Sequence, residues 1–377
     1  MNKYIKIIVG IAVVVFVLAF AVFSKDSNSP AETASAKPTI KIGVTLPLTG
    51  DVASLGEANK NAIVLASEQL KSRNLKYSYE FVFEDDQFKP AIGATAASKL
   101  ISVDNSDAII SFGSPVGNVV SPIAEQSKIL HVNDFASDPK VANGSYNFVH
   151  YTPAKSDAIA FVNELNTRGI KKIVFFAQAD NPGAAAIVNA IREKAAGTDI
   201  KILSTETFLT GTRDFRTNID KVKNLGAELY VLQASSPEIE ILTRQLRASG
   251  IKAPVGSVET FEFSNDLSLF EGLWYVNAAD ATSWFNDLYT KRYGVSPKIG
   301  APNAYDAVNM IVQAVETAGD GKTKPSRTEI RNAFASIQGF NGALGNNLNV
   351  GKDGLVDSKA VIRIIKGGKP VTVSESK

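Results

Sequence analysis

The sequence of 377 residues contains no cysteine and only two histidines. Without cysteine there are no disulfides, no thiol catalysis and no lipid-modified cysteine that could serve as a membrane tether. The two histidines, His131 and His150, lie in or near predicted strands with no metal-ligand spacing around them, so we expect packed side chains and no metal site. No G-x-G-x-x-G motif follows a predicted strand and no Walker loop occurs. The sequence therefore predicts a protein without cofactor that is not an enzyme.

Long runs of like charge are also missing. Charged residues make up 21% of the chain, the formal net charge is +2, and hydrophobic residues account for 45%, as in ordinary globular proteins. Nucleic acid is not an expected partner of such a chain. Roughly 340 residues follow residue 38, which is enough for two lobes that each hold a full core.

The one long apolar run is residues 7–23, which follows Lys3 and Lys6. As a helix it would be about 26 Å long, slightly short of a ~30 Å hydrocarbon core. The preceding lysines predict a cytoplasmic N-terminus, with everything after residue 23 outside. Small residues typical of signal cleavage, at residues 34–36, lie well beyond the run, so the pattern favours an uncleaved membrane anchor over a cleaved signal.

Residues 24–38 are rich in Ser, Ala, Asp and Pro and read as a flexible linker. We therefore expect the chain at the extracytoplasmic face of the cell membrane, anchored by its N-terminal helix. After signal cleavage it would instead be periplasmic or secreted.

From Thr39 onward the chain alternates strands and helices, which predicts parallel sheets with helices on both faces. The run from Thr39 to Leu70 is a strand, a loop with Gly50 and a long helix. Further strands are predicted at 79–84, 107–112, 129–132, 172–177, 200–205, 228–233, 254–258 and 360–365. Further helices are predicted at 90–103, 116–127, 183–196, 215–224, 237–249, 283–293, 302–318 and 327–336. The pattern is that of an α/β protein with two similar halves.

Polar or small residues follow most of the predicted strands, where ligands bind in open α/β sheets. Asp85 and Asp86 are one such pair. Because neighbouring residues of a strand point to opposite faces, we interpret them as turn carboxylates and not as a metal or acid/base site.

Several motifs, in this order and spacing, resemble the type I periplasmic solute-binding proteins, specifically the branched-chain amino-acid (Leu/Ile/Val) binding family of ABC importers. They are IKIGVTLPLTG, EDDQFKP, AIISFGSPVGN, ILHVNDFASDP, TPAKSD, RQLRASGIKAPVGSVE, APNAYDAVNMIVQAVETAG and GFNGALG. The resemblance covers 39–370 and implies a two-lobed fold whose chain crosses between the lobes three times. It implies lobes of 39–152 plus 278–344 and of 153–277 plus 345–372, with a tail at 373–377.

The same resemblance implies a substrate-binding component that captures an amino acid or similar small solute between its lobes and presents it to an ABC permease. A sensor for a separate membrane signalling partner is the alternative.

Three positions match the family's binding pattern for the ligand headgroup. Ser114 precedes Pro115 after a strand, so it is either a simple N-cap or, with the helix N-terminus, a binder of the ligand's α-carboxylate. Ser137 is either a turn serine or a second binder of that carboxylate, with Ala136 beside it. The resemblance implies that the carbonyl of Phe135 accepts a hydrogen bond from the ligand's ammonium. Glu259 ends a strand as either a solvated glutamate or the counter-charge of the ligand's ammonium.

The chain departs from the family where aromatic residues commonly wall the ligand side chain, since it has Leu55, Pro182 and the pair Ser235 and Ser236 there. A different or bulkier amino acid, an amide or a short peptide is therefore expected as readily as Leu, Ile or Val. The aromatic candidates to supply a replacement wall are Tyr151, Phe261 and Trp284, although buried aromatic residues usually belong to the core.

Overall fold

The computed structural model describes residues 37–375 of the chain. The predicted anchor at 7–23 and nearly all of the predicted linker lie outside these residues. Within 37–375, no helix is both long enough and apolar enough to span a bilayer.

The first sheet has five strands in the order β2-β1-β3-β4-β5, and every pair is parallel, as predicted. Side chains alternate between its faces: Ile109 packs with α3 and α4, while its neighbour Ile110 belongs to the core shared with α2 and α10. The strands are β1 (Thr39–Leu46), β2 (Ser78–Asp85), β3 (Ala108–Ser111), β4 (Leu130–Asn133) and β5 (Asn147–Val149). The helices are α2 (Ala53–Leu70), α3 (Pro90–Ser102), α4 (Ser114–Gln126), α9 (Ser283–Tyr293), α10 (Ala301–Ala318) and α11 (Arg327–Ala335).

The second sheet has seven strands in the order β14-β13-β10-β9-β8-β6-β7. Phe175 packs against α5 and α6 on one face, and Phe176 lies in the core with α7 and α8 on the other. The strands are β6 (Lys172–Gln178), β7 (Lys201–Phe208), β8 (Leu229–Gln233), β9 (Val255–Val258), β10 (Trp274–Ala278), β13 (Ala360–Lys366) and β14 (Lys369–Glu375). The helices are α5 (Ala154–Thr167), α6 (Pro182–Ala195), α7 (Arg216–Val222) and α8 (Glu238–Ala248).

Three strands of the second sheet depart from the predicted pattern. The sequence analysis did not find β10 or β14, and β13 pairs antiparallel with both of them. The hairpin between β13 and β14 turns at Gly367 and Gly368, both with positive φ, which allows the chain to reverse in two residues. The remaining small elements are η1 (Pro139–Ala142), η2 (Thr260–Phe263), η3 (Leu267–Phe270) and the paired strands β11 (Phe340–Gly342) and β12 (Gly345–Leu348).

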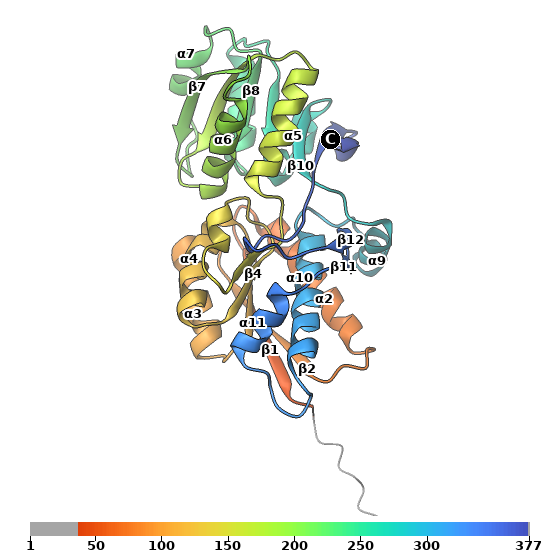
Figure 1. The fold of residues 1–377 in the computed structure, drawn as a ribbon. Helices are drawn as coiled ribbons and strands as arrows, with labels where there is room; N and C mark the ends of the chain where they lie inside the picture. Colours follow the sequence, from red (N-terminus) through yellow and green to blue (C-terminus); the bar gives the residue numbers. More distant parts are fainter. Residues whose placement is uncertain (1–36, 376–377) are drawn as a thin grey trace, which may run out of the picture. The chain divides into compact units, whose positions relative to one another are not determined.

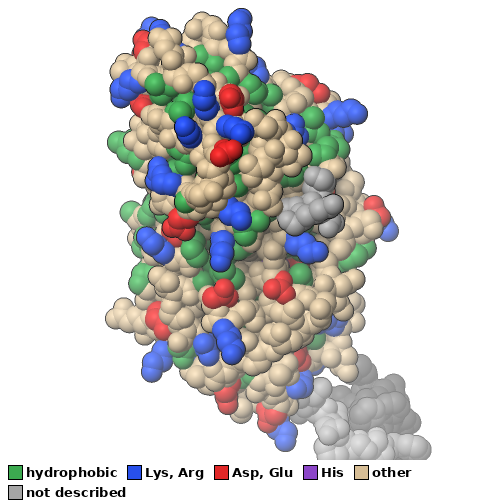
Figure 2. All heavy atoms as spheres, turned by 45° about the horizontal axis from the view of Figure 1, so that its top comes forward, with side chains coloured by type: hydrophobic (Ala, Val, Ile, Leu, Met, Phe, Trp, Pro, Cys, Tyr) green, Lys and Arg blue, Asp and Glu red, His purple; other side chains and the backbone are tan. Residues whose placement is uncertain are grey.

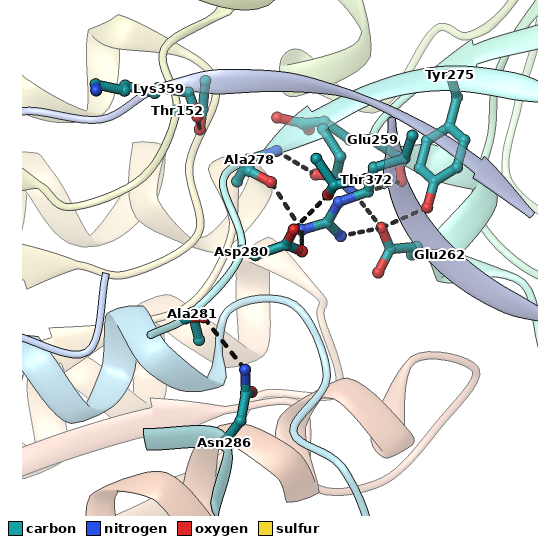
Figure 3. A network of polar contacts seen from close by, with 12 residues as sticks. Thr152, Glu259, Glu262, Tyr275, Ala278, Asp280, Ala281, Asn286, Lys359 and Thr372 are labelled. Carbon is teal, nitrogen blue, oxygen red and sulfur yellow. Dashed lines mark hydrogen bonds and ion pairs between the residues drawn. The ribbon is translucent and has the colours of Figure 1, made fainter. Parts of the chain in front are cut away.

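The chain passes between the two sheets three times, after β5, after β10 and before β13 (Figure 1). These crossing segments are hydrogen-bonded to one another. The Thr152 hydroxyl lies 2.9 Å from that of Ser358, and the amide of Ala279 donates to the carbonyl of Lys359 at 2.9 Å. Figure 3 shows Thr152 and Lys359 beside the polar network that surrounds Ala278 and Asp280. The three crossings together form one hinge region.

We propose that the lobe boundaries follow the two cores. Val350 and Val356 pack in the first core, whereas Ala360 and Ile362 pack in the second. The first lobe is then 38–152 plus 279–357, and the second is 153–278 plus 358–375. The boundary expected from the sequence, at 344, assigns residues 345–357 to the other lobe.

Candidate functional site

Four of the predicted binding residues line one small cavity between the lobes. Ser114 reaches it from the first turn of α4, which follows β3, Phe135 and Ser137 reach it from the loop after β4, and Glu259 reaches it from the end of β9. This is where the carboxyl ends of parallel strands place their loops. The cavity measures about 20 Å³, which is room for about one water molecule. The lining also includes Phe88, Gly113, Pro115, Asn181, Gly183, Ala184, Ile187, Gln233, Thr260 and Phe263.

Ser137 and Glu259 hold the two lobes together at this point. The Ser137 hydroxyl lies 2.8 and 2.7 Å from the two carboxylate oxygens of Glu259, and it donates its single proton to that carboxylate. Both side chains are buried. The predicted carboxylate binder and the predicted counter-charge of the ammonium therefore contact each other directly.

Ser114 is the first residue of α4, and Gly113 is its cap. The N-cap interpretation of Ser114 is therefore wrong by one position. Gly113 has φ 74°, and a Cβ there would lie 2.4 Å from the ring of Phe88, so both its backbone conformation and its surroundings require glycine. The Ser114 hydroxyl accepts a hydrogen bond from the amide of Asp138 at 3.2 Å. It thereby ties the N-terminus of α4 to the loop that carries Ser137.

A larger cavity of about 410 Å³ adjoins the first one. Phe88, Pro115 and Asn181 line both cavities, so the two are neighbours that share part of their walls. Ser235 lines the larger cavity, and its amide donates to Gln178 Oε1 at 2.9 Å. Many of the remaining lining residues are polar, but the surface that they present to the cavity is mainly apolar: Gly50, Asp51, Val52, Gln87, Lys89, Pro90, Gln178, Asp180, Thr210, Ser236 and Glu238.

Three of the predicted site residues do not line either cavity. Leu55 is 3% exposed and packs in the first core, because α2 turns this face toward the sheet, and its neighbour Val52 reaches the larger cavity instead. Pro182 begins α6 and lines a separate groove with Pro139 of η1. Ala136 is buried between two lining residues without lining the cavity itself.

The expected aromatic replacements are also placed elsewhere. Tyr151 is buried against the ring of Phe135 with 4.5 Å between centroids, Phe261 stacks on Phe270 in the second core, and Trp284 is an exposed residue of the first lobe. Aromatic surface in the inner cavity comes from Phe88, Phe135 and Phe263.

Burial raises the pKa of Glu259 to about 7, while the hydrogen bond from Ser137 acts in the opposite direction. Glu259 also has φ 66°, in the left-handed region that a residue with a side chain rarely adopts. Strained backbone of this kind is found preferentially at binding and catalytic sites.

The two histidines are packed within the first lobe. His131 lies between the Ser111 hydroxyl, at 2.7 Å, and Asn147 Oδ1, at 2.8 Å, and burial lowers its pKa to about 4. His150 Nε2 lies 3.5 Å from Asp306. Asp85 and Asp86 accept hydrogen bonds from the amides of Gln87 and Phe88 respectively, as turn carboxylates do. Among residues 37–375, no cluster of His, Cys, Asp and Glu has the arrangement of a metal site.

The sequence analysis missed one polar residue that lines the inner cavity and one that is buried next to it. Gln233, at the end of β8, lines it directly. Asp157, in the first turn of α5, is fully buried beside Glu259. The helix α5 itself was not predicted, although Ala158, Phe161 and Leu165 recur at helical spacing and could have revealed it.

The close approach of the lobes leads to a prediction at Gly183 of α6. A Cβ at this position would lie 2.9 Å from the Ser114 hydroxyl of the other lobe. Gly183→Ala should therefore hinder closure and weaken ligand binding roughly tenfold, which is about 1.4 kcal/mol. Calorimetric titration of the full-length protein measures this effect.

The matched control is Ala185→Gly, which changes the same helix at an exposed position. We expect it to leave affinity unchanged. An unaltered affinity in Gly183→Ala would contradict close packing of α6 on Ser114 in the ligand-bound protein.

Two α/β lobes, a three-segment hinge and polar loops that converge between the lobes define a two-lobed solute-binding protein. Residues 39–369 match the family model described as "Periplasmic binding protein", and the chain belongs to this family. It is a binding protein and not an enzyme.

The chain is similar to several proteins whose names refer to amino-acid binding. It is 26% identical to Leu/Ile/Val-binding protein homolog 3 of Brucella melitensis over 295 residues, which cover 74% of this chain and 79% of that protein. It is 24% identical to the leucine-, isoleucine-, valine-, threonine- and alanine-binding protein of Pseudomonas aeruginosa, over 82% of this chain and 87% of that protein.

Among solved structures, the leucine-binding protein LivK of Thermotoga maritima superposes with a TM-score of 0.82 at 23% identity, covering 90% of this chain and 99% of that one. A solute-binding protein of R. palustris in complex with benzoate superposes with a TM-score of 0.78 at 19% identity, covering 90% and 96%. The mostly parallel two-lobed fold predicted from the sequence is confirmed by these neighbours.

Proposed function

We propose that this chain is the extracytoplasmic substrate-binding component of an ABC importer, and that it binds an α-amino acid or a similar small zwitterion between its lobes. The observation that carries the proposal is the contact of Ser137 with Glu259, which brings one polar residue from each lobe to a single buried point. Curated relatives that bind branched-chain and other amino acids support it.

The first lobe offers neutral hydrogen-bond donors suited to a carboxylate. The N-terminus of α4, a helix of 13 residues, carries partial positive charge, and the hydroxyls of Ser114 and Ser137 lie beside it. The second lobe offers Glu259, which is suited to an ammonium. A zwitterion bound between them would satisfy both lobes at once and favour the closed form.

The fold alone does not determine which class of ligand is bound. A solute-binding protein with the same fold is in complex with benzoate, which has no ammonium group. A buried carboxylate at the point of lobe contact argues for a cationic group in the ligand, because an unpaired buried charge is costly.

The ligand's remaining atoms would extend past Phe88 and Asn181 into the larger cavity. Its volume of about 410 Å³ suits a larger side chain than that of Leu, Ile or Val. We therefore expect larger amino acids, their amides or short peptides among the best ligands.

A thermal-shift screen of the full-length protein against the twenty amino acids, small amides, dipeptides, sugars and benzoate tests the proposal. We expect at least one α-amino compound to raise the melting temperature, by several degrees at 100 times its Kd. Ser114→Ala should reduce that shift, because it removes one donor to the carboxylate. A response to sugars or benzoate alone would contradict the headgroup assignment.

A further inference from the structure

Phe88 lies in the wall between the two cavities. It lines both of them, together with Pro115 of the first lobe and Asn181 of the second, and it has the largest side chain of the three. The inner cavity, of about 20 Å³, has room for about one water molecule and none for a ligand side chain. A ligand whose headgroup binds at Ser137 therefore meets this wall with the atoms that follow its α-carbon.

The backbone at Phe88 has a conformation that a residue of this size rarely adopts. Gln87 and Phe88 have φ of 54° and 59°, both in the left-handed region. Two carboxylates hold this turn, because the amide of Gln87 donates to Asp85 at 3.0 Å and that of Phe88 donates to Asp86 at 2.7 Å. Asp86 also accepts a hydrogen bond from the Thr45 hydroxyl at 2.8 Å. Strained residues persist only where their surroundings fix them, and they are concentrated at ligand-binding positions.

The ring of Phe88 is packed against the first lobe on the side away from the cavities. Its centroid lies 5.9 Å from that of Phe112, with the two rings edge to face. A Cβ at Gly113 would overlap the ring of Phe88, so the ring occupies the space that a side chain at 113 would need. A close-packed ring cannot retreat in that direction to make room for a ligand.

We propose that the ring of Phe88 determines which ligand side chains the cleft accepts. It favours amino acids that are unbranched at the β-carbon and carry their bulk further out, where the larger cavity offers about 410 Å³ with mainly apolar surface. Isoleucine and valine have two heavy atoms on the β-carbon, which widens the side chain where it meets the ring. This inference rests on the proposed function and specifies its substrate class.

Two isomeric amino acids test the selection. Norleucine and isoleucine contain the same atoms and differ only in branching, and calorimetric titration of the full-length protein gives the Kd of each. We expect the wild type to bind norleucine at least about tenfold more tightly, since one methyl group in an apolar pocket changes selection by about 10- to 200-fold. Phe88→Ala should reduce this ratio to about one, mainly by improving the binding of isoleucine.

The ratio separates selection from general damage to the fold. A variant that is merely less stable binds both isomers more weakly and keeps their ratio. Phe83→Ala is the matched control, because Phe83 is a partly buried phenylalanine of the preceding strand β2 and lines neither cavity. We expect it to keep the ratio of the wild type. Phe88→Leu, which retains an apolar side chain, should give a ratio between those of the wild type and Phe88→Ala.

A second measurement needs no ligand and tests whether the ring is fixed. Gly113→Ala should lower the melting temperature, because the new methyl group overlaps the ring of Phe88 and because φ at this position is 74°. In the background of Phe88→Ala the ring is gone and only the effect of φ remains, so the same substitution should cost several degrees less. Equal losses in the two backgrounds would overturn the fixed ring and the selection that depends on it.

Failure of this inference differs from failure of the proposed function. If other α-amino acids bind, but the wild type binds neither isomer or binds isoleucine as tightly as norleucine, the selection by Phe88 is wrong and the proposed function stands. An equal ratio in the wild type and Phe88→Ala has the same meaning. If no α-amino compound of the screen binds the wild type, the proposed function fails, and the selection among amino acids fails with it.

Discussion

Glu259→Gln is expected to lower amino-acid affinity at least about 100-fold, equivalent to about 2.7 kcal/mol. The substitution keeps the shape of the side chain but replaces the buried counter-charge of the ligand's ammonium with a neutral amide. Truncating one partner of a buried hydrogen-bonded charge pair typically costs about 2 to 5 kcal/mol of binding free energy. Calorimetric titration at pH 7.5 with the best amino acid of the screen measures the loss.

The stability of the same variant should change in the opposite direction. The pKa of Glu259 is raised by burial to about 7, so the carboxylate destabilises the fold as the pH rises through that value, and glutamine removes this effect. Glu259→Gln should therefore melt no lower than the wild type at pH 8. A variant that binds more weakly but melts no lower has lost binding and not folding. This result is expected where a residue needed for binding lowers the stability of the fold.

Glu271→Gln is the matched control, because Glu271 lies in the same lobe and bonds the amides of Gly367 and Gly368 far from the cavities. We expect it to leave affinity unchanged. Affinity within threefold of the wild type in Glu259→Gln would contradict the role of Glu259 as counter-charge.

Arg363→Met is expected to destabilise the protein by about 3 to 5 kcal/mol. The Arg363 guanidinium donates to Glu262 at 2.6 Å and to the carbonyl of Ala278 at 2.9 Å, and the side chains of Arg363 and Glu262 are 6% and 9% exposed. Methionine would fill similar space but would leave the Glu262 carboxylate buried without a cation. Figure 3 shows Glu262, Tyr275, Ala278 and Asp280 gathered at this point of the hinge.

Urea unfolding of the full-length protein, followed by tryptophan fluorescence, measures this change. The chain has two tryptophans, and Trp274 reports on the second lobe while Trp284 reports on the first. Asp280→Asn is the matched control. The Asp280 side chain is 57% exposed, so its ion pair with Arg363 should contribute at most about 1 kcal/mol. Equal effects of the two substitutions would show that burial does not decide the strength of this network.

Figure 2 shows lysine and arginine side chains interspersed with acidic ones over the face that it draws. The full sequence has a formal net charge of +2.

Local patterns identified most of the elements that carry the site. Short β-branched runs such as the one ending at Leu46, each followed by helical spacing, identified most of the parallel strands, but β5 and β10 were not predicted although each pairs parallel with a neighbour. Ser114, Ser137 and Glu259 were predicted as binding residues because they match the binding pattern of the family that the sequence resembles, and their positions after strands agree with ligand loops at the carboxyl ends of parallel strands. The turn roles of Asp85 and Asp86 followed in the same way from their position.

The side-chain pocket could not be derived by the same reasoning. Leu55 lies on a helix that a sequence pattern places near the cleft, but the rotation of that helix against the sheet turns Leu55 into the core. A shift of one residue along a helix turns a side chain by about 100°, and only packing against the neighbouring elements fixes that rotation.

The sequence by itself determined the fold class, the family resemblance and the strand ends from which the binding loops emerge, because these depend on local periodicity and on residue order. Only the tertiary structure decided which of those loops meet. Ser137 and Glu259 are 122 residues apart, and Asp157 joins them from a helix that was not predicted. Their proximity depends on how the three hinge crossings fold one lobe onto the other, and therefore on contacts between residues distant in the sequence.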